Sequence, residues 1–205
     1  MEERILVVPR KKLFEDIFEA DGPQGFGTSC LQQMLERIRD FHEFADRKKA
    51  EENPSLKQVI PYVVVCCGEK VFLMRRFANQ DEARLRNLYS LGVGGHINED
   101  ADAHNADVLA AALERELREE INLVGEFSTR LAGYINDDSN PVGQVHFGLA
   151  YRAAVDSECV EVREKEIMSG SFVSVKEAQL VYPQMETWSQ LVLKNIDAFM
   201  QPAGY

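Results

Sequence analysis

The spacing of apolar residues predicts a chain that mixes strands and helices. Short apolar runs bounded by turn residues are typical of strands. They occur at Ile5–Val8, Val59–Cys67, Lys70–Phe77, Ser90–Val93, Phe127–Ile135, Gln144–Val155 and Ser171–Val175. Gly68 and Glu69 predict a hairpin between the second and third of these runs. Because strands and helices do not alternate regularly, we expect an α/β (α+β) fold in which helices sandwich a mixed β-sheet.

Three segments have the apolar spacing of helices, namely Ser29–Ala50, Asn105–Glu120 and Trp188–Phe199. The first repeats apolar residues every three or four positions and would bury that face on the core or on a partner subunit, so it indicates a homodimer as one possible arrangement. Glu51–Ser55 ends this pattern and is the best candidate for a boundary. We therefore predict an N-terminal extension at residues 1–55, with a strand and an amphipathic helix, and a main domain at 56–205.

Two polar segments are predicted to be irregular. Asp21–Gly27 is rich in glycine, but no Lys-Ser or Lys-Thr pair follows it, so a plain turn is favoured over a phosphate-binding loop. Asn79–Asn87 is charged and is predicted to be a loop.

Composition narrows the choice of partners and compartment. The chain has 34 acidic and 23 basic residues and a net charge of −11, so its general field should repel nucleic acids. A small phosphorylated ligand is compatible with that charge if a bound metal inverts the local sign. No apolar run approaches the roughly 20 residues of a membrane span. The first residues resemble a strand more than a signal peptide, and the four cysteines form no CxxC pair. We expect a cytoplasmic protein with reduced cysteines and no membrane partner.

The helix at Asn105–Glu120 carries the most informative chemistry. With about 100° between successive residues, Glu116, Glu119 and Glu120 fall on one arc of this helix, beside an apolar stripe. Three carboxylates at this spacing repel one another and weaken a bare helix. Hard cations such as Mg²⁺ and Mn²⁺ prefer oxygen ligands, and this arc supplies several that point one way. A solvated acidic surface is the alternative, which Glu-Glu alone would favour.

The sequence around this arc resembles the signature of the Nudix hydrolases, Gly-x5-Glu-x7-Arg-Glu-apolar-x-Glu-Glu-x-Gly-apolar. Arg115–Leu123 matches every fixed position of its second half except one, and Gly94-Gly95 resembles the family's loop entry. The order of elements is similar from about Val59 onward, whereas residues 1–55 have no counterpart. The resemblance implies a Nudix-type fold for residues 56–205.

Three positions depart from the signature. Asp107 replaces the first glutamate, with the expected seven residues between it and Arg115. Asn122 replaces the final glycine, where a left-handed conformation is expected, and asparagine tolerates that conformation well. Eleven residues separate Gly95 from Asp107, where the family has five. The extra residues lie within 97–106, a polar and acidic segment whose Glu99, Asp100 and Asp102 would disfavour a triphosphate; a disordered insertion is the alternative.

The resemblance assigns roles to several residues. Glu116, Glu119 and Glu120 would bind Mg²⁺ or Mn²⁺, and Arg115 would pair with these glutamates. Nudix enzymes often take a catalytic base or a further ligand from a late loop, which here contains Glu164 and Glu166; surface glutamates are also common, and we select Glu166.

Other candidates come from the residues themselves. Arg75 and Arg76 would hold a phosphate or form a solvated strand end, and both interpretations stay open. Gly94, Gly95 and His96 would approach the substrate, although His96 would equally serve as a loop cap. His146 is interpreted as a core residue.

The sequence thus predicts a metal-dependent hydrolase that cleaves a diphosphate linked to another moiety, of the nucleoside diphosphate-X type. The alternative is a Nudix domain that binds a nucleotide-like ligand with weak or no turnover; the lengthened segment favours that alternative, and the intact Arg-Glu and Glu-Glu positions favour the enzyme. Diphosphate isomerisation is less favoured because no cysteine lies in a recognisable site motif.

Overall fold

The computed structural model describes residues 2–19, 22–77, 87–123 and 125–201. They form two compact units. Unit 1 comprises Met1–Pro61, Gly95–Glu114 and Gly133–Ala150, and unit 2 comprises Tyr62–Gly94, Arg115–Ala132 and Tyr151–Tyr205. Four long elements contribute residues to both units: β4 (Leu56–Cys67), α5 (Val108–Glu120), β9 (Phe127–Asn136) and β10 (His146–Val155).

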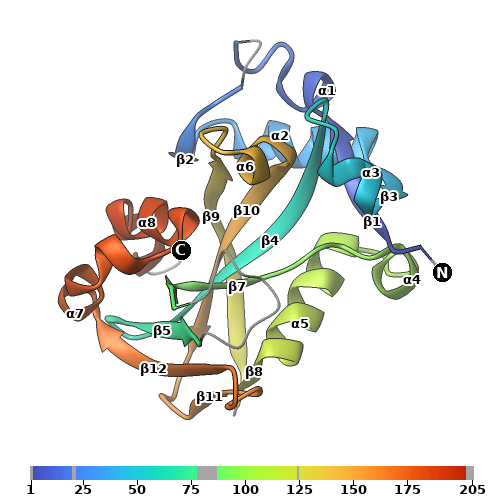
Figure 1. Cartoon of the computed structure of the whole chain (residues 1–205). Helices are drawn as coiled ribbons and strands as arrows, with labels where there is room; N and C mark the ends of the chain where they lie inside the picture. The colour runs from blue at the N-terminus through green and yellow to red at the C-terminus, as the bar shows by residue number, and fades with distance from the viewer. Residues whose placement is uncertain (1, 20–21, 78–86, 124, 202–205) are drawn as a thin grey trace. The chain divides into compact units, whose positions relative to one another are not determined.

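Unit 1 is built on an N-terminal strand. Strand β1 (Arg4–Pro9) pairs antiparallel with β3 (Glu43–Asp46) and with the start of β4, and β2 (Gly25–Gly27) pairs antiparallel with β9. The helices that contribute to this unit include α1 (Arg10–Phe14), α2 (Leu31–Phe41), α3 (Arg47–Glu51), α4 (Glu99–Asp102) and α6 (Pro141–Val145). Figure 1 shows β1, β3 and α3 together near the N-terminus. Strand β1 is apolar and fully buried over Ile5–Val8, which explains why it forms part of the core.

The predicted helix at Ser29–Ala50 is wrong in its second half. Helix α2 ends at Phe41, where the Nδ1 atom of His42 lies 3.0 Å from the carbonyl oxygen of Ile38. The chain then forms β3, in which Phe44 pairs with Leu6 of β1, and the short helix α3. The apolar residues after Phe41 fit a helix pattern as well as a strand pattern, and pairing with β1 decides between them.

The glycine-rich segment before α2 is also more regular than predicted. Gly25–Gly27 forms strand β2, opposite Tyr134–Asn136 of β9. A Cβ atom on Gly27 would lie 2.4 Å from the Cζ atom of Tyr134, so glycine allows this strand to approach the tyrosine ring. Asp21, the first residue of the predicted turn, lies outside the described residues.

Unit 2 contains the predicted hairpin. Strand β5 (Lys70–Arg76) pairs antiparallel with β4, and Gly68 adopts a φ of +56° at the turn. Strand β12 (Met168–Ser174) pairs with β5 along its full length, as Figure 1 shows. Strands β6 (Tyr89–Ser90) and β7 (Gly92–Gly94) pair with β5 and β4, respectively. A separate two-stranded sheet joins β8 (Ile121–Leu123) to β11 (Val160–Val162).

The chain ends in short helical segments rather than one helix. They are α7 (Val175–Leu180), a 3₁₀ turn at Tyr182–Gln184, α8 (Thr187–Lys194) and α9 (Asp197–Met200). The helix predicted for Trp188–Phe199 is interrupted after Lys194, where Asn195 leaves the helical conformation. Across the described residues the fold is a mixed α/β fold with a large sheet, which confirms the predicted class. The predicted loop at Asn79–Asn87 lies almost wholly outside the described residues.

The lengthened segment after Gly95 is integrated into unit 1. The amide of Leu6 donates to the carbonyl of Ile97 at 2.9 Å, and helix α4 follows. Asp102 is 1% exposed and accepts a hydrogen bond from the amide of Asn98 at 2.7 Å. Glu99 forms an ion pair with Arg4. The segment therefore packs with the N-terminal strand and is not a disordered insertion.

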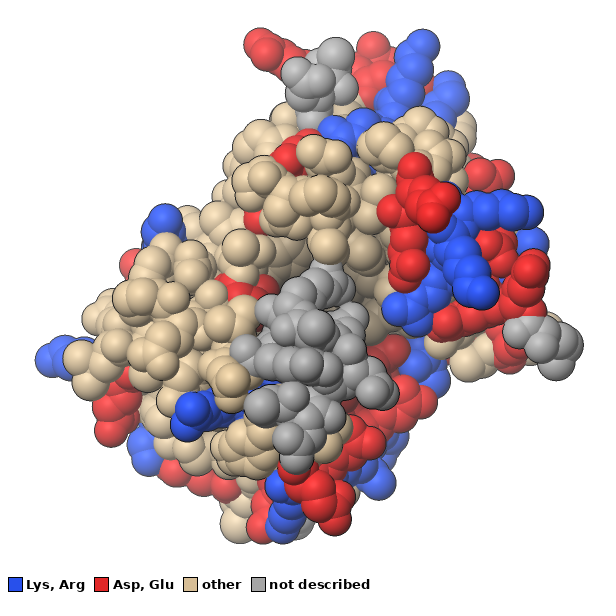
Figure 2. Space-filling model, in the orientation of Figure 1, with Lys and Arg blue, Asp and Glu red and all other residues tan. Residues whose placement is uncertain are grey.

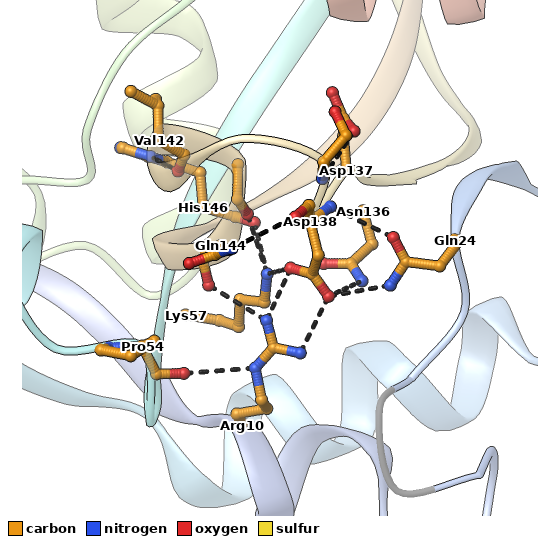
Figure 3. A network of polar contacts seen from close by, with 12 residues as sticks. Arg10, Gln24, Pro54, Lys57, Asn136, Asp137, Asp138, Val142, Gln144 and His146 are labelled. Carbon is orange, nitrogen blue, oxygen red and sulfur yellow. Dashed lines mark hydrogen bonds and ion pairs between the residues drawn. The ribbon is translucent and has the colours of Figure 1, made fainter.

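A buried ion network crosses unit 1, and the sequence analysis did not identify it (Figure 3). The Nζ atom of Lys57, whose side chain is 0% exposed, donates to Asp138 at 2.7 Å and to the carbonyl of Gly143 at 2.9 Å. Arg10 donates two hydrogen bonds to the same carboxylate, at 2.6 and 2.9 Å. Burial lowers the pKa of Lys57 to about 8, although Asp138 opposes this shift. Asp138 is thus the common ion-pair partner of Arg10 and Lys57.

The surface in Figure 2 carries charges of both signs. Over α3, Lys and Arg side chains lie among acidic ones, and Arg47 forms ion pairs with Glu3 and Glu51, both at 2.9 Å. Of the helices in the described part of the chain, none combines the length and the apolar character that a membrane span requires.

Candidate active site

Helix α5 positions the acidic residues that the sequence analysis singled out. The Oδ1 atom of Asp107 accepts hydrogen bonds from the amides of Leu109 and Ala110, both at 3.1 Å, and so caps the start of the helix. Leu109, Leu113 and Leu117 are buried along one face. This burial fixes the rotation of the helix, and the acidic residues of its last turn lie beside the apolar stripe, as predicted.

Arg115 engages two of the three predicted ligands. Its Nη1 atom donates to Oε1 of Glu116 at 2.7 Å and to Oε2 of Glu119 at 3.1 Å. The side chain of Glu116 is 12% exposed and that of Glu119 is 58% exposed. The pairing between Arg115 and the glutamates that the sequence predicts is therefore present, and it partly neutralises the repulsion between the carboxylates.

Glu120 lies in the most perturbed environment of the arc. Burial raises its pKa to about 6, and the negative charges of Glu116 and Glu164 add to this shift, while Arg76 opposes it. Its side chain is 20% exposed, and its Oε2 atom lies 3.5 Å from Nη2 of Arg76. Ionising this carboxyl is costly in the absence of a further cation. Perturbed carboxyls of this kind concentrate at functional sites.

The carboxylate oxygens of Glu116, Glu119 and Glu120 suit a hard divalent cation. In this conformation, however, the three side chains do not converge on one point. The arc offers carboxylate oxygens, which Mg²⁺ and Mn²⁺ prefer. Within the described ranges, no group of three or more His, Cys, Asp or Glu side chains is arranged to hold a metal ion. Arg115 holds Glu116 and Glu119 in their present positions. A cation that binds here would have to exchange with the guanidinium as the partner of these carboxylates.

The late loop reaches the end of α5 through its backbone. The amide of Arg163 donates to the carbonyl of Glu120 at 2.9 Å, directly after the pairing of β11 with β8. This contact explains why the charge of Glu164 affects Glu120. Glu166, selected from the same loop, is exposed. The resemblance alone did not decide between Glu164 and Glu166, because it indicates which loop supplies the base but not which position within that loop.

The two adjacent arginines of β5 have different surroundings. Arg76 is near Glu120, whereas the guanidinium of Arg75 lies over the ring of Tyr89, 5.5 Å from its centroid. Successive residues of a strand point to opposite faces, which explains this division.

The Gly94-Gly95 pair joins the end of β7 to the segment of unit 1 that begins at Gly95. Gly94 ends β7, and Gly95 and His96 follow, all three partly exposed. His96 contacts Gln58 and His146 through its Nε2 atom, at 2.8 and 3.3 Å. His146, interpreted from the sequence as a core residue, is partly exposed and belongs to this cluster.

The left-handed conformation expected for Asn122 is wrong. The residue lies in β8, where it pairs with Glu161 of β11, and it has no positive φ. The chain passes from α5 directly into a strand, so the backbone after Glu120 is held by pairing and needs no left-handed cap.

Comparison with known proteins identifies the family. A model of the NUDIX domain matches residues 57–195, and the chain belongs to this family. Protein YmaB of Bacillus subtilis (strain 168) is 38% identical over 207 residues, which cover 96% of this chain and 98% of that protein.

Solved structures agree with this assignment. Tm1382, described as a putative Nudix hydrolase, is 30% identical, with a TM-score of 0.78 over 95% of this chain and 98% of its own. The NUDIX domain of Shewanella oneidensis NrtR, solved with ADP ribose, is 12% identical, with a TM-score of 0.53 over 71% of this chain and 89% of its own, and is similar in fold alone.

Proposed function

We propose that the chain is a divalent-metal-dependent hydrolase that cleaves a diphosphate linked to another moiety. The observation that carries this proposal is the acidic end of α5, where the partly buried Glu120 lies 3.5 Å from Arg76 and has a pKa of about 6 beside Glu116. Nudix hydrolases generally use divalent metals, and the chain belongs to that family. Glu116, Glu119 and Glu120 would hold Mg²⁺ or Mn²⁺. When bound, such a cation neutralises the diphosphate and lowers the pKa of an attacking water.

The protein residues supply positioning and proton transfer. Arg76, 3.5 Å from Glu120, is available to pair with a phosphate oxygen once the glutamate has another partner. Arg115 would brace the glutamates as it does in this conformation, with contacts of 2.7 and 3.1 Å. Glu166 would act as general base, with Glu164 as the competing residue of the same loop. Gly94, Gly95, His96 and Arg75 would contribute to substrate binding.

The substrate class that we propose is a diphosphate ester carrying a second organic group. The NUDIX domain of NrtR, whose fold is similar, was solved with ADP ribose, a compound of this class. The acidic segment after Gly95 gives weaker support than the sequence suggested. Asp102 is buried and Glu99 is paired with Arg4, so Asp100 is the member of the three that is exposed without a described ion pair. A cytoplasmic location and a homodimer remain predictions.

A substrate screen tests this function. The tag-free protein is incubated with a panel of nucleoside diphosphate sugars, dinucleoside polyphosphates, ADP ribose and nucleoside triphosphates, with Mg²⁺ or Mn²⁺, and products are identified by mass spectrometry. We expect cleavage within the diphosphate of at least one diphosphate ester, and little cleavage of triphosphates. Binding of such compounds without any product would contradict hydrolysis and indicate a ligand-binding domain.

A further inference from the structure

Two histidines of unit 1 lie in contact, and the proposed hydrolase assigns a role, in substrate binding, to His96 and none to His146. His96 follows the glycine entry, and His146 begins β10. Their Nε2 atoms lie 3.3 Å apart, and the Oε1 atom of Gln58 lies 2.8 Å from the Nε2 atom of His96. Gln58 belongs to β4 and is fully buried, whereas both histidines are partly exposed. We propose that these three side chains form a binding site for a transition-metal ion such as Zn²⁺ or Co²⁺.

Hydrogen bonding fixes which atoms of this cluster carry lone pairs. The Nδ1 atom of His146 lies 2.7 Å from the carbonyl oxygen of Val142, which only accepts, so Nδ1 carries the proton (Figure 3). In the neutral ring the Nε2 atom of His146 therefore carries a lone pair, which accepts from His96. The Nε2 atom of His96 faces this nitrogen and also the amide oxygen of Gln58. One hydrogen on His96 thus lies between two acceptors.

In the other neutral tautomer of His96 the proton moves from Nε2 to Nδ1, and the Nε2 lone pair of His96 then joins those of His146 Nε2 and Gln58 Oε1 as ligands for one cation. Zn–N bonds measure about 2.0–2.1 Å, so two nitrogen ligands of a tetrahedral ion lie about 3.3 Å apart. The observed separation of the two Nε2 atoms equals that edge. Gln58 lies somewhat closer to His96 and would need a shift of a few tenths of an ångström. The partial exposure of both histidines leaves access for a water as fourth ligand.

Two further features support this site. Metal-bound histidines usually donate their second ring N–H to a carbonyl or carboxylate, as His146 does to Val142. The Nε2 atom of Gln58 is buried and has no hydrogen-bond partner among the described residues. The Oε1 atom of the same amide faces His96, so the carbonyl end of this buried glutamine is the end turned toward the histidine pair.

Imidazole ligands suit transition metals, whereas Mg²⁺ prefers the carboxylate oxygens of α5. The ionic surroundings oppose a strongly charged site, because Lys57 donates to the carbonyl of His146 at 3.1 Å and Arg10 lies in the same network. Asp138 supplies the compensating negative charge. We therefore expect one moderately bound ion per chain. This inference does not depend on the proposed hydrolase activity.

Titration with Co²⁺ tests the site directly. Tag-free protein in excess Mg²⁺ is titrated while visible absorption reports four-coordinate Co²⁺, and Zn²⁺ is then added as competitor. We expect one Co²⁺ per chain, displaced by Zn²⁺. The variants His96→Gln and His146→Gln should each weaken binding at least tenfold, whereas His104→Gln, which changes an exposed histidine, should bind as the wild type does. Circular dichroism checks that each variant is folded.

A second test uses a variant that should bind Co²⁺ more tightly, because unfolding cannot cause tighter binding. Gln58→Glu places a carboxylate oxygen where the amide oxygen lies and should tighten Co²⁺ binding at least tenfold. The proposal is overturned if the wild type binds no Co²⁺, or if the histidine variants bind it as the wild type does. It is also overturned if Glu116→Gln abolishes the absorption while both histidine variants keep it.

Discussion

Removal of the charge of Asp138 should destabilise the protein more than any other single change in the ion network of unit 1. Its carboxylate accepts hydrogen bonds from Arg10, Lys57, Gln24 and Asn136, at 2.6 to 3.3 Å. These partners place the pKa of Asp138 well below its usual range, against the opposing effect of burial. Asp138→Asn keeps the shape of the side chain but leaves the buried Lys57 without its ion-pair partner.

The expected loss is large because an uncompensated buried charge is costly. Removal of one partner of a buried ion pair destabilises a protein by about 3–5 kcal/mol. Whole domains are stable by about 5–15 kcal/mol, so the variant should be close to the limit of folding. Lys57→Met removes the expensive charge itself and leaves Asp138 bonded to Arg10. Its cost should be smaller, about 1–3 kcal/mol, because the carbonyls of Gly143 and His146 lose their donor but no buried charge is left unpaired.

The effect should also depend on pH. The pKa of Lys57 is about 8 in the folded protein, against 10.5 for an unperturbed lysine. The unfolded chain therefore binds this proton more tightly, so the free energy of unfolding rises as pH rises from about 8 to 10.5, and the gain is lost as pH falls back from 10.5 to 8. Above pH 8 Lys57 is neutral and no longer needs Asp138. The cost of Asp138→Asn should accordingly shrink between pH 7 and pH 9.5.

Urea unfolding at the two pH values measures these differences. With an m-value of about 2 kcal/mol/M, Asp138→Asn should lower the urea midpoint at pH 7 by about 1.5–2.5 M. Lys57→Met is the matched control at both pH values. A cost below about 1 kcal/mol at pH 7, or a cost that does not shrink at pH 9.5, would refute the reasoning.

Three other changes have defined outcomes. Because the pKa of Glu120 is about 6 in the fold and about 4.5 when unfolded, its ionisation destabilises the metal-free protein as pH rises through 6. Glu120→Gln in EDTA should therefore melt higher than wild type at pH 7, by the equivalent of about 1–2 kcal/mol, and not at pH 4. Asn122→Gly should lower the free energy of unfolding by about 0.5–1 kcal/mol, whereas Asn122→Val should leave it unchanged, because the residue lies in a strand. A Gly variant more stable than wild type would argue against strand β8. Gly143→Ala puts a Cβ atom 1.6 Å from the carbonyl oxygen of Asp137 and should cost about 2 kcal/mol or more, whereas Val142→Ala, at an exposed position, should unfold like wild type.

Local sequence patterns correctly predicted the helices and strands whose structure is set by residues close to them in the chain. The hairpin of β4 and β5 follows from two apolar runs around Gly68, and the buried stripe of α5 follows from the spacing of Leu109, Leu113 and Leu117. Strand β3 was mistaken for helix because its identity is set by pairing with β1, almost forty residues earlier in the chain. Asn122 was misassigned for the same reason, since its partner Glu161 lies in β11.

Part of the candidate site could also be predicted from local sequence patterns. The glutamate arc and its pairing with Arg115 follow from helical periodicity, so the sequence indicated them. The role of Asp138 was not visible, because Arg10 and Lys57 reach it from positions 128 and 81 residues away. The contact between His96 and His146 similarly joins residues 50 positions apart. Such clusters are created by the sheet and have no local signature.

Metal-dependent turnover tests the central claim most directly. The rate of product formation from the best diphosphate ester is measured with Mn²⁺ for wild type, Glu120→Gln and Glu114→Gln, a matched change at an exposed position of the same helix. We predict that EDTA abolishes turnover, that Glu120→Gln lowers kcat at least a hundredfold while remaining folded, and that Glu114→Gln is as active as wild type. Turnover by Glu120→Gln at the wild-type rate, or activity that survives EDTA, would contradict the account.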